Sequence, residues 1–254
     1  MSPVRPGTGF SAWIQYVQPV SAGGMVLVCF PHAAGSASAY RDWCAVLAGY
    51  GIEVWPVQLP GRESRFTEPL TTDLAELTGA VAEPLRTNLA GRPYAIYGHS
   101  AGAMMAYGLA LRMEADGGPG PYHLFVGACR PPSRPDPDFP IHRLPPDRFL
   151  ARLTGYGRIP QEILGFPDLV EQIATTARAD LRLVETHPWD SGMVVDCPVT
   201  AFGGVSDPAV PVGTLADWGQ ITSGTFTRVV LPGGHFPPPS GERQLLEGIR
   251  RGIG

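Results

Sequence analysis

The sequence predicts an α/β protein with a mostly parallel sheet, helices on both faces of that sheet and one helical insertion. Three observations support this fold class: six short apolar runs, helical patterns that alternate with them, and one Pro-rich segment that interrupts the alternation. The chain has 254 residues, of which 44% are hydrophobic, and this is enough for one domain with a substantial core. We therefore expect a single domain over residues 1–254.

The predicted strands are short, continuous apolar runs. They cover residues 25–30, 52–57, 94–97, 123–126, 199–202 and 227–231. An unbroken apolar run is typical of a parallel strand with helices packed on both faces. We therefore expect all six strands to be buried on both faces.

Helical patterns occupy the intervals between these strands. Asp73 is a predicted N-cap, because Glu76 follows three residues later and apolar residues then recur on one helical face. Residues 101–113 are apolar nearly all round, which predicts a buried helix. A last helix is expected over residues 241–250.

One segment breaks the alternation of strands and helices. Residues 130–158 hold seven prolines, six arginines and three aspartates, and a helical pattern then continues to about residue 184. The segment lies between two predicted sheet strands. We therefore expect residues 130–184 to form a lid inserted into the domain.

The composition excludes several classes of protein. The chain contains no lysine, which excludes Schiff-base chemistry, pyridoxal phosphate anchoring and the P-loop. A net charge of −4 argues against a general nucleic-acid or membrane-surface binder. The longest apolar run is far too short to span a bilayer, and no secretory signal pattern is present.

The cysteines and histidines do not form metal-ligand patterns. The four cysteines are far apart, with no CxxC pair, and the histidines form no HxH or HxxxH pair. We therefore expect buried free thiols in a reducing cytoplasm, no metal and no disulfide.

Residues 98–102, Gly-His-Ser-Ala-Gly, match the G-x-S-x-G pattern. They follow a predicted strand and open an apolar helix, which is the context of a nucleophile elbow with Ser100 as nucleophile. The glycines allow close approach of the strand and helix, and the helix N-terminus places partial positive charge near a developing oxyanion. The alternative is a Gly-rich turn with Ser100 as a capping residue.

A serine nucleophile requires a base and an orienting acid, which follow in the order Ser, acid, His. His235 follows the last predicted strand in a loop with two glycines, and it is the predicted base. Asp207, after the preceding strand, is the predicted acid, with Asp136 and Asp138 as alternatives. The alternative interpretation is that neither residue is catalytic. In that case His235 is a surface residue in a turn, and Asp207 stabilises a turn before Pro208.

An oxyanion hole requires two backbone N–H groups near the nucleophile. Ala101, the residue after Ser100, supplies one, and Ala33 in the loop after the first strand is our prediction for the other. His32 and His99 lie beside these positions in the sequence, and we interpret both as structural.

These motifs together resemble the type II thioesterases that accompany modular polyketide and nonribosomal peptide synthases, a family with the α/β-hydrolase fold. The matching segments are FPHAAGSASAYRDW at 30–43, LPGRESRFTEP at 59–69, YGHSAGA at 97–103, GGVSDPAV at 203–210 and LPGGHF at 231–236. The PGRESR stretch is the most discriminating of them, because plain esterases lack it. The triad of the family falls on Ser100, Asp207 and His235.

The resemblance implies a function as well as a fold. It implies a cytoplasmic enzyme without a cofactor of its own, which hydrolyses acyl thioesters from the phosphopantetheine arm of acyl or peptidyl carrier proteins. By family analogy the enzyme clears stalled or mis-primed acyl units. The alternatives are a general carboxylesterase, a product-releasing or cyclising thioesterase, and a noncatalytic binding module. We expect a monomer.

The chain departs from the family pattern at several positions. Ala34 stands where a glycine is usual, and Ala101 stands where methionine is common. Residues 126–128 are smaller than usual, and the stiff stretch 236–239 is expected to delay the last helix to about Gly241. These departures bear on substrate preference, because both alanines keep the backbone N–H.

Charge in the Pro-rich stretch suggests a docking surface. Residues 130–158 carry six arginines and three aspartates, a balance of +3 in a chain of net charge −4. Carrier domains are typically acidic, so Arg143 and Arg148 are the predicted docking residues. The alternative is a solvated loop with scattered charge.

Overall fold

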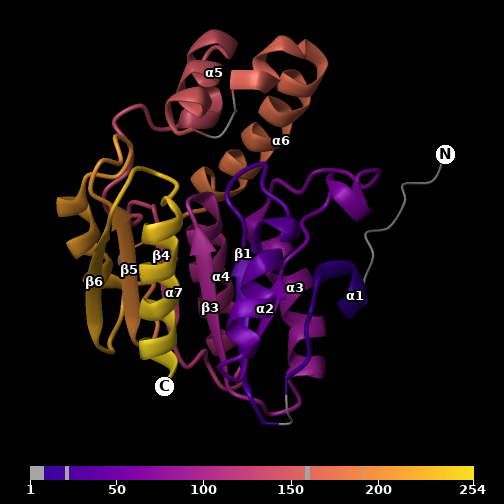
Figure 1. Cartoon of the computed structure of the whole chain (residues 1–254), viewed down its shortest axis with the longest axis vertical. Helices are drawn as coiled ribbons and strands as arrows, with labels where there is room; N and C mark the ends of the chain where they lie inside the picture. The colour runs from indigo at the N-terminus through magenta and orange to yellow at the C-terminus, as the bar shows by residue number, and fades with distance from the viewer. Residues whose placement is uncertain (1–8, 21–22, 158–160, 191) are drawn as a thin grey trace.

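The computed structural model describes residues 9–20, 23–157, 161–190 and 192–254, and its centre is a parallel sheet (Figure 1). The strands are β1 (Met25–Phe30), β2 (Ile52–Pro56), β3 (Tyr94–His99), β4 (Leu124–Gly127), β5 (Val199–Gly204) and β6 (Phe226–Leu231). They lie in the order β2-β1-β3-β4-β5-β6, and every neighbouring pair is parallel. The predicted α/β class with a parallel sheet is confirmed.

Helices cover both faces of this sheet. The α-helices are α1 (Phe10–Trp13), α2 (Arg41–Ala48), α3 (Leu74–Leu89), α4 (Ala101–Ala115), α5 (Pro146–Gly155), α6 (Pro167–Glu185) and α7 (Pro239–Ile253). Short 3₁₀ helices cover Ala37–Tyr40, Glu63–Arg65, Ile141–Arg143, Gln161–Gly165 and Val212–Ile221. The helices α2 and α7 pack on one face, and α3 and α4 pack on the other (Figure 1).

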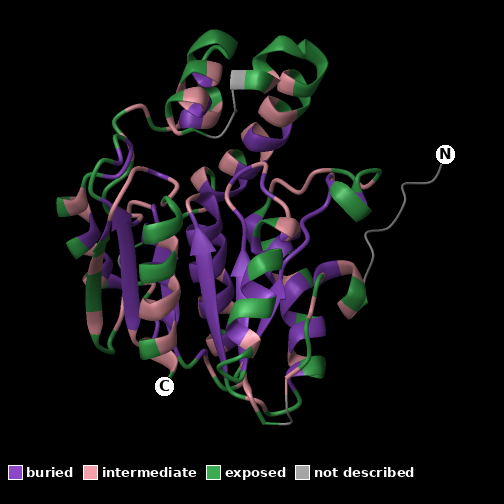
Figure 2. Ribbon diagram, in the orientation of Figure 1, coloured by how far each residue is buried: buried purple, intermediate pink, exposed green. Residues whose placement is uncertain are grey.

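Strand β1 shows why its sequence is an unbroken apolar run. Val26 and Val28 point into the core on the α3 and α4 face, whereas Leu27 and Cys29 point into the core on the α2 and α7 face. All four side chains are fully buried, as the purple centre of the sheet in Figure 2 illustrates. Successive residues of a strand point to opposite faces, so both sets must be apolar when both faces are covered.

Strand β6 differs from the prediction that all six strands are buried on both faces. Thr227, Arg228 and Val230 are exposed, and this part of the prediction is wrong. Among the strands of the described residues, β6 pairs with β5 alone and forms an edge of the sheet. A charged residue on an exposed edge also hinders pairing with another chain.

The helix ends follow local sequence signals. The Asp73 side chain accepts a hydrogen bond from Glu76 N (2.9 Å), so the predicted N-cap of α3 is confirmed. Helix α7 begins at Pro239, earlier than the expected start at Gly241, and α5 begins at Pro146, inside the Pro-rich stretch. Both prolines stand in the first turn, where the missing N–H costs nothing and the fixed φ suits a helix.

The 130–184 segment lies between β4 and β5 and carries α5 and most of α6, which lie beyond the carboxyl ends of the strands (Figure 1). Phe149 and Leu153 of α5 are buried and belong to the main hydrophobic core, and the Arg178 guanidinium of α6 lies 4.0 Å from the centre of the Phe149 ring. Arg158, which contributes to the charge balance above, lies outside the described residues.

Two further observations concern the whole chain. Within the described residues, no helix combines the length and apolar composition needed to cross a bilayer. The four cysteines are free, and three of them, Cys29, Cys44 and Cys197, are buried.

Candidate active site

Ser100 lies in a tight turn between β3 and α4. Its backbone has φ 57° and ψ −122°, a conformation that is rare for a residue with a side chain. Its backbone N–H donates to the carbonyl of Gly127 on β4 (2.7 Å), which fixes the turn against the neighbouring strand.

The two glycines of the motif make this turn possible. A Cβ atom at Gly98 would lie 2.0 Å from the carbonyl oxygen of Gly102, and one at Gly102 would lie 2.4 Å from the carbonyl oxygen of Phe30. Both contacts are with backbone atoms, which cannot move aside. The spacing of the motif therefore follows from the close approach of β3, α4 and the end of β1.

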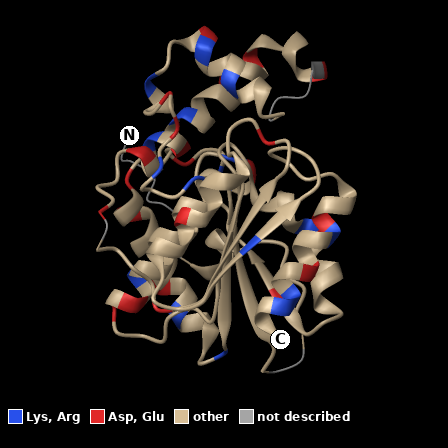
Figure 3. Cartoon of the chain, turned by 90° about the vertical axis from the view of Figure 1, so that its left-hand side faces the viewer, with Lys and Arg blue, Asp and Glu red and all other residues tan. Residues whose placement is uncertain are grey.

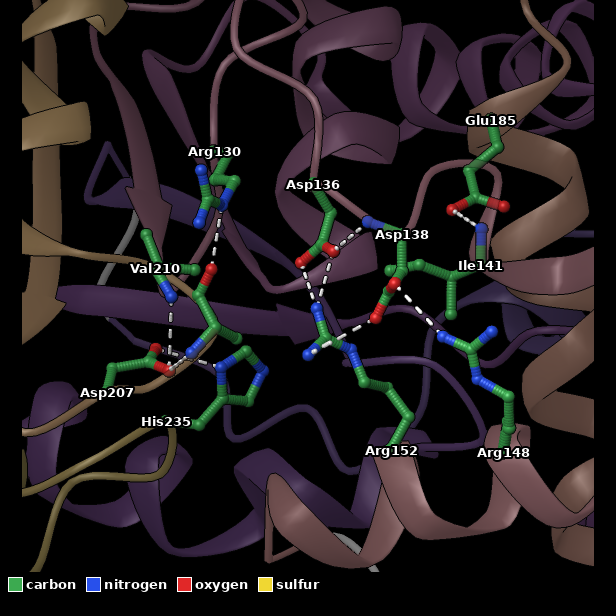
Figure 4. Close-up of polar contacts among 11 residues, drawn as sticks. Arg130, Asp136, Asp138, Ile141, Arg148, Arg152, Glu185, Asp207, Val210 and His235 are labelled. Atoms are coloured by element: carbon green, nitrogen blue, oxygen red, sulfur yellow. Dashed lines mark hydrogen bonds and ion pairs between the residues drawn. The ribbon is translucent and has the colours of Figure 1, made fainter. Parts of the chain in front are cut away.

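The side chains of three residues from separate loops form a continuous chain of hydrogen bonds that begins at Ser100. Ser100 Oγ lies 3.0 Å from His235 Nε2, and His235 Nδ1 lies 2.9 Å from Asp207 Oδ2. The second carboxylate oxygen of Asp207 accepts hydrogen bonds from the backbone N–H groups of Ala209 (2.8 Å) and Val210 (3.3 Å). Asp207 and His235 are both buried, and Figure 4 shows the contact between them.

The loops after β5 and β6 bring Asp207 and His235 together. Ser206 N donates to the carbonyl of Gly233 (2.9 Å), and a Cβ atom at Gly204 would lie 2.1 Å from the carbonyl oxygen of Gly234. Gly233 itself has φ +92°. The paired glycines therefore let the His235 loop lie directly against the Asp207 loop.

The two alternative acids bind arginines of the 130–184 segment. Asp136 forms an ion pair with Arg152 (2.5 Å), and Asp138 forms one with Arg148 (3.2 Å), as Figure 4 shows. Of the three aspartates considered from the sequence, Asp207 is the one whose carboxylate reaches the imidazole.

Aromatic rings surround the imidazole of His235. The ring of Tyr156, which follows α5, stacks on it with 4.9 Å between ring centres and an angle of 20°. Phe236 contacts it edge-on at 5.3 Å, and His99 contacts it edge-on at 5.6 Å. The sequence does not predict this position of Tyr156, because no local pattern indicates which part of the 130–184 segment covers the site.

The oxyanion loop, residues 31–36, lies beside the Ser100 turn. Ala33 in this loop and Ala101 at the start of α4 are both buried, and the close approach of Gly102 to the carbonyls of Phe30 and Pro31 joins the two segments. Ala34 has φ 58°, a left-handed conformation that favours glycine. This explains why a glycine is usual at this position in the family it resembles.

His32 and His99 pack with aromatic residues near the site. The ring of His99 stacks on Phe236 (5.1 Å), and His32 contacts Phe236 edge-on (4.9 Å). Tyr97 Oη lies 3.1 Å from His99 Nδ1. Burial, with a smaller contribution from Cys29, raises the pKa of Tyr97 well above its usual value, so this hydroxyl stays protonated.

A buried ion pair, which the sequence does not predict either, contacts the oxyanion loop. Arg62 of the PGRESR stretch binds Asp180 of α6 through two hydrogen bonds (2.6 and 2.8 Å), and both side chains are buried. Asp180 Oδ2 also accepts a hydrogen bond from Ala34 N (2.8 Å). The PGRESR stretch distinguishes this sequence from plain esterases, but the sequence does not show that Asp180 is the partner of Arg62.

A cavity of about 370 Å³ opens at Ser100 and His235 beneath the 130–184 segment. Its lining is mostly apolar and includes Met104, Leu153, Tyr156, Val184 and Trp189. His187 also lines it, and burial, partly offset by the charge of Asp73, lowers the pKa of this histidine. A concave apolar cavity of this size with a few polar groups is typical of a small-molecule site.

The arrangement suits nucleophilic catalysis by a serine hydroxyl. The hydroxyl faces an imidazole, and the imidazole faces a buried carboxylate. In the part of the chain that the structure describes, no group of three or more His, Cys, Asp or Glu side chains is arranged to hold a metal ion.

The sequence model of the thioesterase domain family matches residues 25–252. The chain belongs to the thioesterase family. The thioesterase PikA5 of Streptomyces venezuelae is 34% identical to it, over 88% of this chain and 79% of that protein. The predicted class of enzyme, a thioester hydrolase, is thus confirmed.

Solved structures agree with this assignment. The RedJ thioesterase from the prodiginine pathway of Streptomyces coelicolor is 34% identical, with a TM-score of 0.84 and coverage of 92% of each chain. The type II thioesterase BorB from the borrelidin biosynthetic cluster is 32% identical, with a TM-score of 0.83 and coverage of 95% of this chain and 98% of that one. The α/β-hydrolase fold and the resemblance to type II thioesterases are both confirmed.

Proposed function

We propose that this thioesterase hydrolyses acyl groups from the phosphopantetheine arm of acyl or peptidyl carrier proteins, with Ser100 as nucleophile, His235 as base and Asp207 as orienting acid. The single observation that carries the catalytic assignment is the continuous chain of hydrogen bonds from Ser100 through His235 to Asp207. The proposed substrate class is supported by the family and by the biosynthetic pathways named for the RedJ and BorB relatives.

The reaction takes place in two stages. Ser100 Oγ attacks the thioester carbonyl while its proton moves to His235 Nε2, and the backbone N–H groups of Ala33 and Ala101 stabilise the oxyanion. The C–S bond breaks, and the proton passes from His235 to the leaving thiol. Water then gives a proton to His235 and attacks the acyl-serine ester. The bond between Ser100 Oγ and the acyl carbon breaks, His235 returns its proton to Ser100 Oγ, and the carboxylic acid leaves.

The cavity beneath the 130–184 segment accommodates the acyl group, and this segment acts as its lid. The mostly apolar lining favours an acyl chain over a charged group. The Tyr156 ring covers one face of the His235 ring, so the 130–184 segment excludes water from that face of the imidazole.

The biological task we propose is editing, in which stalled or mis-primed acyl units are cleared from a polyketide or nonribosomal peptide synthase. The enzyme works in the cytoplasm as a monomer, and it needs no cofactor because the substrate itself carries phosphopantetheine. Three buried free thiols suit a reducing compartment.

The carrier protein docks on the 130–184 segment through Arg143 and Arg148. Both arginines are exposed, at the end of a 3₁₀ helix and on α5, respectively. Figure 3 shows charges of both signs on the helices beyond the sheet, and Arg148 faces Asp138 at 3.2 Å. An exposed pair of this kind is weak, so an acidic partner can compete for the arginine.

Mixing the protein with an acyl-loaded carrier and following intact masses tests the proposal. We expect free carrier together with a transient acyl adduct on the wild type, and neither with Ser100→Ala. Cleavage of p-nitrophenyl esters with the acyl-carrier left intact would instead identify a general carboxylesterase. A cyclised product would identify a product-releasing enzyme, and unchanged behaviour of Ser100→Ala would indicate a noncatalytic module.

A further inference from the structure

The oxyanion loop is held by side chains from two distant parts of the fold. Within the loop, Gly35 N donates to the carbonyl of His32 (2.7 Å), which closes a turn around Ala33 and Ala34. A Cβ atom at Gly35 would lie 2.8 Å from the same carbonyl, so the turn is tight. Its strained member, Ala34 with φ 58°, requires support from outside the turn.

Asp180 and Arg62 supply this support. Asp180 Oδ2 accepts the N–H of Ala34 at 2.8 Å, and Arg62 Nη1 donates to the carbonyl of Gly35 at 3.2 Å. The same two side chains bind each other through two hydrogen bonds, with only 8% and 3% of their side-chain surfaces exposed. The ion pair therefore holds one donor and one acceptor of the loop backbone, directly after Ala33.

Gln58 extends this network on the other side of the loop. Its amide nitrogen donates to the carbonyl of Arg62 (3.0 Å), and its amide oxygen accepts the N–H of Ala37 (3.2 Å). Arg62 is thus fixed at its backbone as well as at its guanidinium. Gln58 is fully buried, which makes these hydrogen bonds costly to lose.

A contribution to stability does not explain this arrangement. Replacement of a buried ion pair by apolar residues is often neutral or stabilising, so the pair alone adds little to folding. What an apolar pair cannot provide is a charged acceptor for Ala34 N and a donor for the Gly35 carbonyl. The feature that distinguishes this ion pair is that both side chains form hydrogen bonds with the backbone of the oxyanion loop.

We propose that Asp180 and Arg62 are positioning residues, which orient the oxyanion loop so that Ala33 N–H points at the oxyanion. This inference rests on the proposed function, because it requires Ala33 N–H to be an oxyanion donor. Since Asp180 belongs to α6 of the 130–184 segment, the oxyanion hole is complete only when that helix lies in the observed position.

Asp180→Asn tests this inference. Whichever way the asparagine amide turns, its NH₂ group faces either Ala34 N–H or the guanidinium of Arg62, so one donor faces another. Removal of an oxyanion donor costs about 10² to 10³ in kcat, and we expect a displaced donor to cost about 10- to 100-fold. KM for a small acyl thioester should change by less than about threefold, because the ground state uses the cavity and not the oxyanion hole.

Glu53→Gln is a matched control. Glu53 is also buried, binds Arg92 through two hydrogen bonds (3.2 and 3.3 Å) and accepts a backbone N–H, that of Val20 (3.1 Å). It lies on β2 and contacts no residue of the oxyanion loop through these bonds. We expect this variant to lose stability and to keep the wild-type kcat per active site.

Two readouts separate positioning from a merely structural role. Active-site titration with a fluorophosphonate counts folded sites, and kcat is expressed per titrated site. An acyl trifluoromethyl ketone adds to Ser100 and forms an oxyanion, so its affinity should fall by the same factor as kcat/KM in Asp180→Asn. The affinity for the product acid should stay the same.

A second variant keeps the test decisive if Asp180→Asn folds poorly. The double substitution Arg62→Met with Asp180→Leu removes both charges, and it should restore folding without restoring kcat. Wild-type kcat per site in either variant would overturn the inference and leave the proposed function intact. A wild-type protein that hydrolyses no acyl thioester would instead overturn the proposed function.

Discussion

The two carboxylate oxygens of Asp207 have different hydrogen-bond partners. One oxygen accepts the N–H groups of Ala209 and Val210, and the other lies 2.9 Å from His235 Nδ1. The backbone donors fix the orientation of the carboxylate before any substrate binds. The carboxylate therefore selects the tautomer in which Nδ1 carries the proton and Nε2 faces Ser100.

Asp207→Asn is expected to remove activity while keeping the fold. The amide oxygen should stay with the two backbone N–H groups, which places the NH₂ group against Nδ1 and leaves the proton on Nε2. In that tautomer His235 cannot accept the Ser100 proton, and we expect kcat to fall by about 10⁴-fold, as in serine protease triads.

The measurement is kcat on a small acyl thioester, with circular dichroism as a check on folding. Asp136→Asn is the matched control, because this aspartate also lines the cavity but its carboxylate binds Arg152. A loss in Asp136→Asn equal to that in Asp207→Asn would contradict the assignment of the acid.

Helix α5 has one side that faces the core and the site and another side that faces the solvent. Its buried side carries Phe149 and Leu153 into the core, and it ends next to Tyr156 over the His235 ring. Its outer side carries Arg148 to the surface. One short helix thus connects a candidate docking surface to the imidazole, with its first turn set by Pro146.

Charge reversal on this surface should separate docking from chemistry. We expect the double variant Arg143→Glu with Arg148→Glu to raise KM for acyl-carrier substrates by about tenfold, because surface charges change association more than they change the reaction. KM and kcat for a small acyl thioester should not change. The salt dependence of kcat/KM for the carrier substrate should also become weaker.

Arg228→Glu is the control for the change in net charge. Arg228 is exposed on β6, away from the 130–184 segment, so it should affect both substrates equally. If the docking variant loses activity equally on the carrier and on the small thioester, Arg143 and Arg148 do not form the docking surface.

The sequence predicts those elements whose signals are local. Strand β1 is an apolar run, Asp73 caps α3 and the glycines around Ser100 mark a turn, and each of these depends on neighbours in the chain. The edge position of β6 depends on strand order, which no strand carries in its own sequence. A run of prolines is also ambiguous, because the same residue breaks a helix or begins one.

The same distinction applies to the site. Ser100 and its glycines belong to one motif, whereas Asp180 and Tyr156 reach the site only because α5 and α6 lie over the sheet. Their contacts to Ala34 and His235 cross large intervals of sequence. No pattern around either residue predicts such a contact, and only the docked position of the 130–184 segment reveals it.

His123 connects three elements of the whole molecule. It precedes β4, its Nε2 lies 2.8 Å from Thr200 Oγ1 on β5, and its Nδ1 lies 3.1 Å from the carbonyl of Gly252 on α7. Its ring stacks on Phe125 with 4.1 Å between ring centres. Burial lowers the pKa of His123 to about 4, and the hydrogen bond to Gly252 opposes this only in part.

This pKa makes the stability of the protein depend on pH. The unfolded chain binds a proton at His123 below its ordinary pKa of 6.5, whereas the folded chain does so only near 4. Between these two values the unfolded state holds more protons, so the free energy of unfolding falls as the pH falls. Each pH unit in this window is equivalent to about 1.4 kcal/mol, and a decrease from about pH 7.5 to pH 5 should cost about 2 kcal/mol.

Comparison of the wild type with His123→Gln isolates this contribution. Glutamine does not titrate, so the variant should lack the part of the pH dependence that belongs to His123, although the lost ring packing on Phe125 lowers its stability at every pH. Urea unfolding at about pH 7.5 and pH 5 gives both free energies, and the difference between the two pH values should be smaller in the variant by about 2 kcal/mol. If both proteins lose the same free energy between the two pH values, His123 is not held neutral by the fold, and its bonds to β5 and α7 do not make the whole molecule acid-sensitive.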